Sequence, residues 1–188
     1  MDGLALDTEP TYAHAWRQAA TEFGVEIDEE FCHSLFGHHA DDVEQALKRK
    51  IGNGFDRLRF HELAARHWRA YAATYGIAKM PGLDELLDLL ARRRIPYALA
   101  TNSDGPYAGE CLRLARAIER FPLLITRDQV AHGKPAPDLF LEAAERLRTS
   151  PAHCLILEDS ETGLLAARKD GGPALLVTRA PDVPARVR

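Results

Sequence analysis

The side chains of this sequence that could do chemistry lie in four short segments rich in oxygen and nitrogen donors. They are Asp2, the run Thr101, Asn102 and Ser103, then Lys134, and the adjacent acids Glu158 and Asp159. Adjacent carboxylates supply the oxygen ligands that Mg2+ prefers. A lysine ammonium with hydroxyl and amide donors neutralises the charge of a phosphate group, and a further carboxylic acid protonates a leaving oxygen. The set is therefore typical of metal-assisted phosphoryl transfer.

The chemistry of each side chain gives a predicted role. We predict that Glu158 and Asp159 bind Mg2+ and that Ser103 contacts the substrate. The predicted catalytic residues are Asp2, Thr101, Asn102 and Lys134. Each residue alone has a structural explanation, because an acid after a strand often caps a helix and a single lysine is usually solvated. The prediction depends on the whole set, and on the elements that would bring it together.

The expected elements divide the chain into two stretches with different patterns of apolar residues. Residues 8–78 carry apolar side chains at helical spacing, as in Tyr12, Ala15, Trp16 and Ala19. From Pro81 onward, amphipathic helices alternate with short apolar runs, which is typical of buried parallel strands. The expected helices lie near 8–24, 31–36, 40–51, 55–75, 83–90, 137–147 and 162–169. The expected strands lie near 95–100, 123–125, 154–157 and 174–178.

This alternation predicts an α/β fold, a doubly wound parallel sheet with a small inserted helical domain. In such sheets, functional groups collect beyond the carboxyl ends of the strands. Thr101 follows one expected strand and Glu158 follows another, while Lys134 precedes an expected helix. The fold would therefore gather residues that lie far apart in the sequence at one edge of the sheet.

Composition narrows the class of protein. The net charge of −4 gives no electrostatic reason to expect nucleic acid as a partner. No apolar run approaches the roughly 20 residues that cross a bilayer, and the first residues do not resemble a signal peptide. Three widely spaced cysteines predict neither a disulfide framework nor a zinc site. We therefore expect a cytoplasmic protein with no nucleic-acid or membrane partner. We also expect a monomer or weak dimer, and the small helical domain suits a small phosphorylated metabolite as the substrate.

Four motifs resemble those of the haloacid dehalogenase superfamily, specifically its phosphatases with a small helical cap, which include relatives of pseudouridine-monophosphate phosphatase and beta-phosphoglucomutase. They are residues 1–10, 98–103, 133–138 and 155–160. The resemblance implies a core of residues 1–7 plus 82–188 and a helical cap at 8–78. It also implies Mg2+-dependent hydrolysis through an aspartyl-phosphate, with the backbone carbonyl of Asp2 as a further metal ligand.

The first motif of that superfamily is Asp-x-Asp-Gly, whose first Asp attacks phosphorus and whose second acts as general acid and base. Asp2 matches the second Asp and Met1 matches the x. The nucleophile and the central strand before it would therefore precede Met1. We expect the 188-residue chain to be inactive, through a shortened sequence rather than a genuine loss, because the other motif residues are all present.

Alternatives within and beyond this superfamily remain. The related mutases carry a His near the start of the first cap helix and an Arg after the cap glycine, where this sequence has Tyr12 and Ala40. Dehalogenases lack the general acid that Asp2 supplies. A catalytically dead binding or regulatory homologue is the remaining hypothesis. For the phosphatase, the resemblance also predicts that His38 and His39 lie on a cap loop that contacts the substrate.

Overall fold

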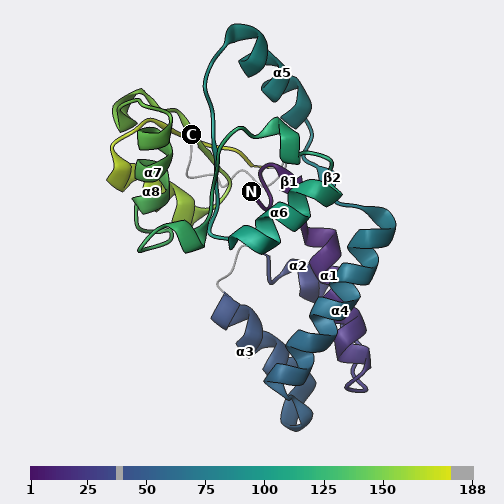
Figure 1. Cartoon of the computed structure of the whole chain (residues 1–188). Coiled ribbons are helices and arrows are strands. Elements are labelled where there is room, and N and C mark those ends of the chain that lie inside the picture. The colour runs from purple at the N-terminus through teal and green to yellow at the C-terminus, as the bar shows by residue number, and fades with distance from the viewer. Residues whose placement is uncertain (37–39, 179–188) are drawn as a thin grey trace. The chain divides into compact units, whose positions relative to one another are not determined.

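The computed structural model describes residues 1–36 and 40–178, which form two compact units (Figure 1). The helical unit contains residues 7–78 together with Asp2. The α/β unit contains Met1, residues 3–6 and the chain from residue 79 onward. The predicted fold class, an α/β core with an inserted helical domain, is confirmed.

The helical unit is built of helices that lie where the apolar spacing predicts them. They are α1 (Glu9–Thr21), α2 (Glu29–His33), α3 (Ala40–Ile51) and α4 (Arg57–Tyr75), with a 3-10 turn at Gly52–Gly54. Asp28 and Asp56 cap α2 and α4 by accepting hydrogen bonds from the first-turn N–H groups of Phe31 and Arg59, at 2.7 and 3.1 Å. Thr8, which precedes α1 and has a side chain of a type that often caps helices, makes no such side-chain bond. Its backbone carbonyl instead accepts the hydroxyl of Thr11.

The core of the helical unit is apolar and lies largely where α1 packs beside α4. Phe60 is 1% exposed, and its ring lies 6.1 Å from that of Phe23 and 5.5 Å from that of Phe55. One buried polar contact joins the two helices, because the Trp68 indole donates to the hydroxyl of Thr11 at 2.9 Å. The helical unit is therefore stabilised mainly by burial of apolar surface.

The α/β unit alternates helices and short strands in the expected order. Its main elements are α5 (Leu83–Arg93), β3 (Leu99–Ala100), α6 (Gly105–Leu114), β4 (Leu124–Ile125), α7 (Asp138–Arg146), β5 (Ile156–Glu158), α8 (Glu161–Asp170) and β6 (Ala174–Leu176). The sequence analysis did not predict α6, which begins after a cap in which Asp104 accepts the N–H of Tyr107 at 2.9 Å. It also missed β1 (Leu6–Asp7) and β2 (Ala78–Lys79), which pair with each other.

The strands are shorter than predicted, and in the described residues they form three two-stranded sheets instead of one continuous sheet. β3 pairs in parallel with β4, with Leu99 opposite Leu124, and β5 pairs in parallel with β6, with Leu157 opposite Leu175. Among the described residues, β3 pairs only with β4, and β5 pairs only with β6. Because a strand is defined by the residues that pair with a neighbour, each of these strands is short.

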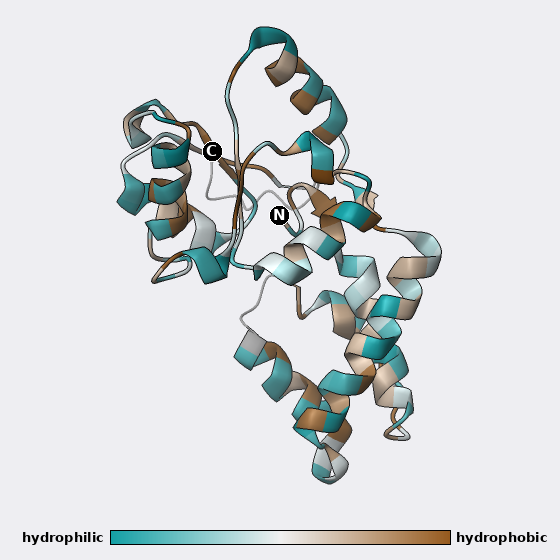
Figure 2. Ribbon diagram, in the orientation of Figure 1, coloured by the Kyte–Doolittle hydropathy of each residue, from teal (hydrophilic) through white to brown (hydrophobic). Residues whose placement is uncertain are grey.

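Helices cover these strand pairs and connect them. α7 packs against β3 and β4, α8 packs against β5 and β6, and the two helices pack against each other. Figure 2 shows α7 and α8 with both hydrophilic and hydrophobic residues, as expected of amphipathic helices that pack against strands. Among the described residues, no helix is both long and apolar enough to cross a membrane.

Candidate active site

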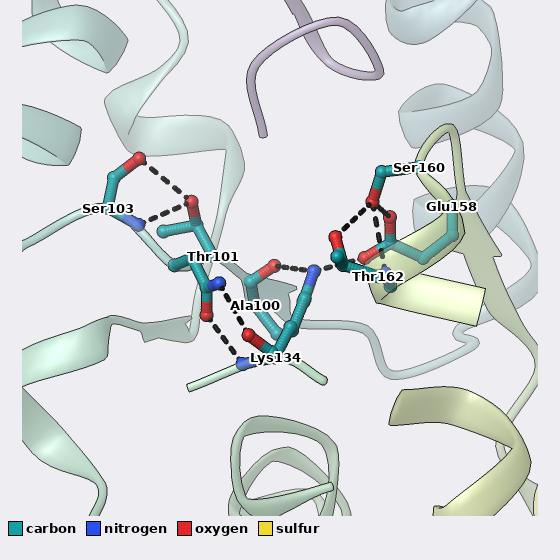
Figure 3. Close-up of polar contacts among 9 residues, drawn as sticks. Ala100, Thr101, Ser103, Lys134, Glu158, Ser160 and Thr162 are labelled. Atoms are coloured by element: carbon teal, nitrogen blue, oxygen red, sulfur yellow. Dashed lines mark hydrogen bonds and ion pairs between the residues drawn. The ribbon is translucent and has the colours of Figure 1, made fainter. Parts of the chain in front are cut away.

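Polar side chains meet at the carboxyl ends of β3 and β5, within the α/β unit (Figure 3). Thr101 directly follows β3, and Glu158 is the last residue of β5. Lys134 comes from the loop between β4 and α7 and reaches both strand ends. This is the edge at which parallel α/β sheets place their functional groups.

Lys134 links the two strand pairs through a buried ion pair. Its ammonium pairs with a carboxylate oxygen of Glu158 and donates to the carbonyl of Ala100, at the end of β3, at 3.3 Å. The two side chains are only 7% and 5% exposed. The ammonium also lies 4.8 Å from the centre of the Phe140 ring, where a cation is attracted to the aromatic face. The buried charges are thus compensated on several sides, which such a pair requires.

The other carboxylate oxygen of Glu158 is held by the start of α8. Ser160 donates its hydroxyl to this oxygen at 3.1 Å and caps α8 by accepting the N–H of Gly163, also at 3.1 Å. A side chain at position 163 would place its Cβ 2.1 Å from the carboxylate, so the closeness of Glu158 requires a glycine there. The N-terminal end of α8 also favours a negative charge beside it.

Thr101 and Ser103 form a compact turn that ends β3. The Thr101 hydroxyl accepts the N–H of Ser103 and donates to the Ser103 hydroxyl, both at 3.1 Å. Thr101 is 3% exposed, and its backbone N–H continues the parallel pairing by donating to Ile125 at 2.9 Å. The turn therefore brings two hydroxyl groups together at the end of β3, close in the chain to the carbonyl that Lys134 contacts.

Asn102, between them, faces the loop that carries Lys134. Its side-chain oxygen accepts the backbone N–H of Lys134 at 2.8 Å, and its side-chain nitrogen donates to the backbone carbonyl of Lys134 at 3.2 Å. Both polar atoms of the amide are therefore engaged by one residue of the chain.

Asp159 is the acid of the set whose surroundings best suit a cation. Its carboxylate lies against Gly3, where a Cβ would come within 2.2 Å of Oδ2, so the N-terminal segment and Asp159 are brought together. Burial raises the pKa of Asp159, and the Glu158 carboxylate adds to this, while the amino group of Met1 and Lys134 oppose it. A divalent cation would stabilise such a charge, so the donor set fits Mg2+. Among the described residues, no three His, Cys, Asp or Glu side chains are grouped to hold a metal ion.

Asp2, His38 and His39 are the remaining residues predicted for the site. Asp2 is half-buried and groups with the helical unit, whereas Met1 and Gly3 on either side group with the α/β unit. Its role as general acid stays a prediction. His38 and His39 lie outside the described residues. The sequence analysis missed Gly163 and Phe140 as neighbours of the charged pair. The sequence does contain a signal for Gly163, because the run Ser-Glu-Thr-Gly that ends at this residue is typical of the start of a capped helix.

This chain is similar to known proteins over most of its length. The family model described as haloacid dehalogenase-like hydrolase matches residues 1–177. The fructose-1-phosphate phosphatase YqaB of Escherichia coli (strain K12) is 32% identical over 93% of this chain and 92% of its own length. The beta-phosphoglucomutase of Bacillus subtilis (strain 168) is 30% identical, over 91% of this chain and 77% of its own.

Solved structures agree with these relatives. A HAD family hydrolase from Deinococcus radiodurans R1, with bound phosphate and sodium, superposes with a TM-score of 0.77 and 27% identity, over 98% of this chain and 80% of that one. Such similarity over nearly the whole chain includes both the helical and the α/β unit.

Proposed function

Because the chain belongs to the haloacid dehalogenase-like hydrolase family, we propose that it is a Mg2+-dependent phosphatase that hydrolyses small sugar phosphates. The observation that carries the proposal is the gathering of hydroxyls, an ammonium and carboxylates at the ends of β3 and β5. Support for the substrate class comes from the relatives, among which one is named a fructose-1-phosphate phosphatase. The bound phosphate in the Deinococcus radiodurans R1 hydrolase supports a phosphate site in this fold.

The residues of the α/β unit would bind and orient the phosphate. In our proposal, the hydroxyls of Thr101 and Ser103 donate to two phosphate oxygens, and the Lys134 ammonium neutralises charge that grows during transfer. Glu158 keeps that ammonium at the site, since it is paired with Lys134 and buried with it. Because these donors are held before the substrate arrives, little reorganisation is needed when charge develops.

Mg2+ would be held by Asp159, with Glu158 and the backbone carbonyl of Asp2 as further ligands, as the family resemblance implies. When bound, the ion neutralises phosphate charge and orients the reacting group. Since both Glu158 oxygens already have partners, Asp159 is the ligand we expect to matter most for affinity. Calorimetric titration of Mg2+ tests this. Asp159→Asn should abolish binding, and binding that is unaffected by the substitution would contradict the assignment.

The proposed reaction passes through an aspartyl-phosphate, and the attacking Asp aligns with the position immediately before Met1. That carboxylate would attack phosphorus as the ester oxygen leaves, and Asp2 would protonate the leaving oxygen. Asp2 would then take a proton from the water that hydrolyses the aspartyl-phosphate, which releases phosphate, frees the attacking carboxylate and returns Asp2 to its protonated form.

The test compares three proteins that differ only before Met1. They are the 188-residue chain, the chain preceded by an apolar strand that ends in Asp, and the same extension ending in Asn. We expect only the Asp-ended protein to release phosphate from sugar phosphates, and chelation of Mg2+ should stop it. The other two should be no faster than Asp159→Asn. Activity of the 188-residue chain that Asp159→Asn removes would show that the nucleophile is misplaced.

Two alternatives remain as outcomes of the same experiment. The similarity to beta-phosphoglucomutase favours a mutase as the second candidate. Tyr12 and Ala40 stand where the family resemblance expects the His and Arg of the mutases, which disfavours it. Isomerised sugar phosphate in place of free phosphate would identify the mutase. No turnover by the Asp-ended protein, with retained binding of sugar phosphates, would identify a binding or regulatory protein.

A further inference from the structure

The loop that carries Lys134 is held by side-chain hydrogen bonds at two places, one within the loop and one from the end of β3. Upstream, the guanidinium of Arg127 donates to the carbonyls of Val130 and Ala131 at 2.9 and 3.2 Å. At Lys134 itself, the amide of Asn102 accepts from the backbone N–H and donates to the backbone carbonyl. The second contact spans two loops that lie more than thirty residues apart in the sequence.

The chain packs closely around this second contact. A Cβ at Gly133 would lie 2.6 Å from the side-chain oxygen of Asn102 and 2.7 Å from Cδ of Arg127. Both side chains therefore lie against the Cα of the residue before Lys134. The glycine permits an approach that another residue would block, so the contact with Asn102 is built into the path of the loop.

The two ends of Lys134 are fixed by groups from the same strand end. Asn102 holds its backbone and Ala100, the last residue of β3, accepts from its ammonium. A lysine side chain is long and flexible, so fixing its ammonium costs rotamer entropy. Fixing the backbone limits the conformations in which the ammonium still reaches Ala100 and Glu158. Without this restraint, the loop could move and carry the ammonium away from both.

We propose that Asn102 is a positioning residue, which holds the backbone of Lys134 so that the ammonium stays at the ends of β3 and β5. Asn102 then acts through Lys134 and does not itself touch the phosphate, which revises its predicted catalytic role. The consequence for hydrolysis rests on the proposed function. The consequence for Lys134 does not, so it is measured without turnover.

The experiment measures how fast an amine-reactive acyl ester labels each lysine, by peptide mass spectrometry of the 188-residue chain. Lys134 is buried and paired, so in the unsubstituted chain it should react far more slowly than exposed Lys48 and Lys50 of α3. In Asn102→Ala, its labelling rate should rise about tenfold, the effect expected from losing two modest hydrogen bonds. The rates of Lys48 and Lys50 should stay unchanged. Asn53→Ala, a change of the same kind on an exposed turn of the helical unit, is the matched control and should leave Lys134 unaffected.

Asn102→Asp provides a second variant, which keeps an acceptor for the Lys134 N–H but sets a carboxylate oxygen against the Lys134 carbonyl in place of the donor. A rise in Lys134 labelling that Lys48 and Lys50 do not share supports positioning, and this test remains if the alanine variant does not fold. An unchanged rate in both variants overturns the proposal, as does a rise that Lys48 and Lys50 share, since that reports general loosening.

Inorganic phosphate is added separately to test the proposed function. Failure of phosphate to protect Lys134, with the Asn102 effect intact, would count against the phosphatase and not against the positioning role.

Discussion

The interiors of the two units are stabilised by different kinds of interaction. The helical unit buries aromatic and aliphatic side chains between α1 and α4, where the Trp68 indole also donates a hydrogen bond to the Thr11 hydroxyl. The α/β unit has short strand pairs, and its best buried contact between them is the ion pair of Lys134 and Glu158. Burial of apolar area is non-directional, whereas a buried ion pair stabilises only when its geometry is satisfied. Tolerance to substitution should differ between the units accordingly.

Spectroscopy can separate the two units. The chain has two tryptophans, and both Trp16 and Trp68 belong to the helical unit. Tryptophan fluorescence therefore follows unfolding of the helical unit, while circular dichroism follows helices of both. If the units unfold independently, a substitution in one should shift only its own transition.

The largest effect is expected in the helical core. Phe60→Ala should lower the free energy of unfolding by about 4 kcal/mol, because it leaves a cavity between Phe23 and Phe55. Urea titration followed by tryptophan fluorescence measures this. Leu58→Ala, two residues away in α4 and 75% exposed, is the control and should change the midpoint little. A small shift for Phe60→Ala would show that the core collapses to fill the space.

Breaking the ion pair should have the next largest effect. Glu158→Ala leaves a buried ammonium without its carboxylate, which should cost about 3 kcal/mol. The loss should appear in the circular dichroism transition and leave tryptophan fluorescence unchanged. Glu161→Ala, an exposed acid in the first turn of α8, is the control.

A double variant sharpens this result. Lys134→Met combined with Glu158→Gln removes both charges, so it should lose less stability than Glu158→Ala alone. Equal losses would mean that packing of Glu158 against Gly163, and not its charge, is what stabilises the strand ends.

A smaller effect is expected where α8 begins. Gly163→Ala places a methyl group 2.1 Å from the Glu158 carboxylate, so the carboxylate must shift away from Ser160 and Lys134. We expect a loss of about 2 kcal/mol, in the range of overpacked sites. Gly54→Ala, with open space around its Cβ position, should be nearly neutral. The same circular dichroism titration compares them, and equal midpoints would contradict the tight packing at Gly163.

The sequence alone predicted the helices better than the strands. Apolar spacing located α1, α3 and α4 to within a few residues because helical hydrogen bonds are local. α1 ends at Thr21, before the glycine at position 24 that was expected to end it. The run at 95–100 is apolar throughout, yet only Leu99 and Ala100 pair as a strand. Pairing depends on a neighbour distant in sequence, which residue types alone do not specify.

The candidate site was predictable as a set of residue types and not as a set of contacts. Oxygen and nitrogen donors at expected strand ends identified Thr101, Lys134 and Glu158. Nothing in their spacing showed that Asn102 would turn to the backbone of Lys134. The sequence marks Gly163 as part of a helix start, but its closeness to the Glu158 carboxylate is seen only in the structure.

The smallest predicted effect is a pH dependence confined to the helical unit. Glu22 accepts from the ring of His67 at 2.7 Å and Glu44 from that of His61 at 3.0 Å, which connect α4 to the end of α1 and to α3. These hydrogen bonds lower the pKa of both carboxyls below the usual value of 4.5. Burial, with the charge of His67, lowers the pKa of His14 below 6.5. Since all three folded values are depressed, each group contributes stability at higher pH and loses it as the pH falls.

The urea midpoint of tryptophan fluorescence should therefore decrease in two steps on acidification. The first step begins as the pH falls below 6.5 and belongs to His14, which must then be protonated beside the Tyr71 ring, 4.4 Å away. The second begins below 4.5 and belongs to Glu22 and Glu44. His14→Gln should remove the first step alone, and Glu22→Gln with Glu44→Gln should reduce the second alone. The Glu22 and Glu44 carboxyls are solvent-accessible, so both steps should be small beside the loss from Phe60→Ala. A midpoint that rises on acidification from pH 6.5 would show that His14 prefers to be charged in the folded protein, and would reverse the sign of the first step.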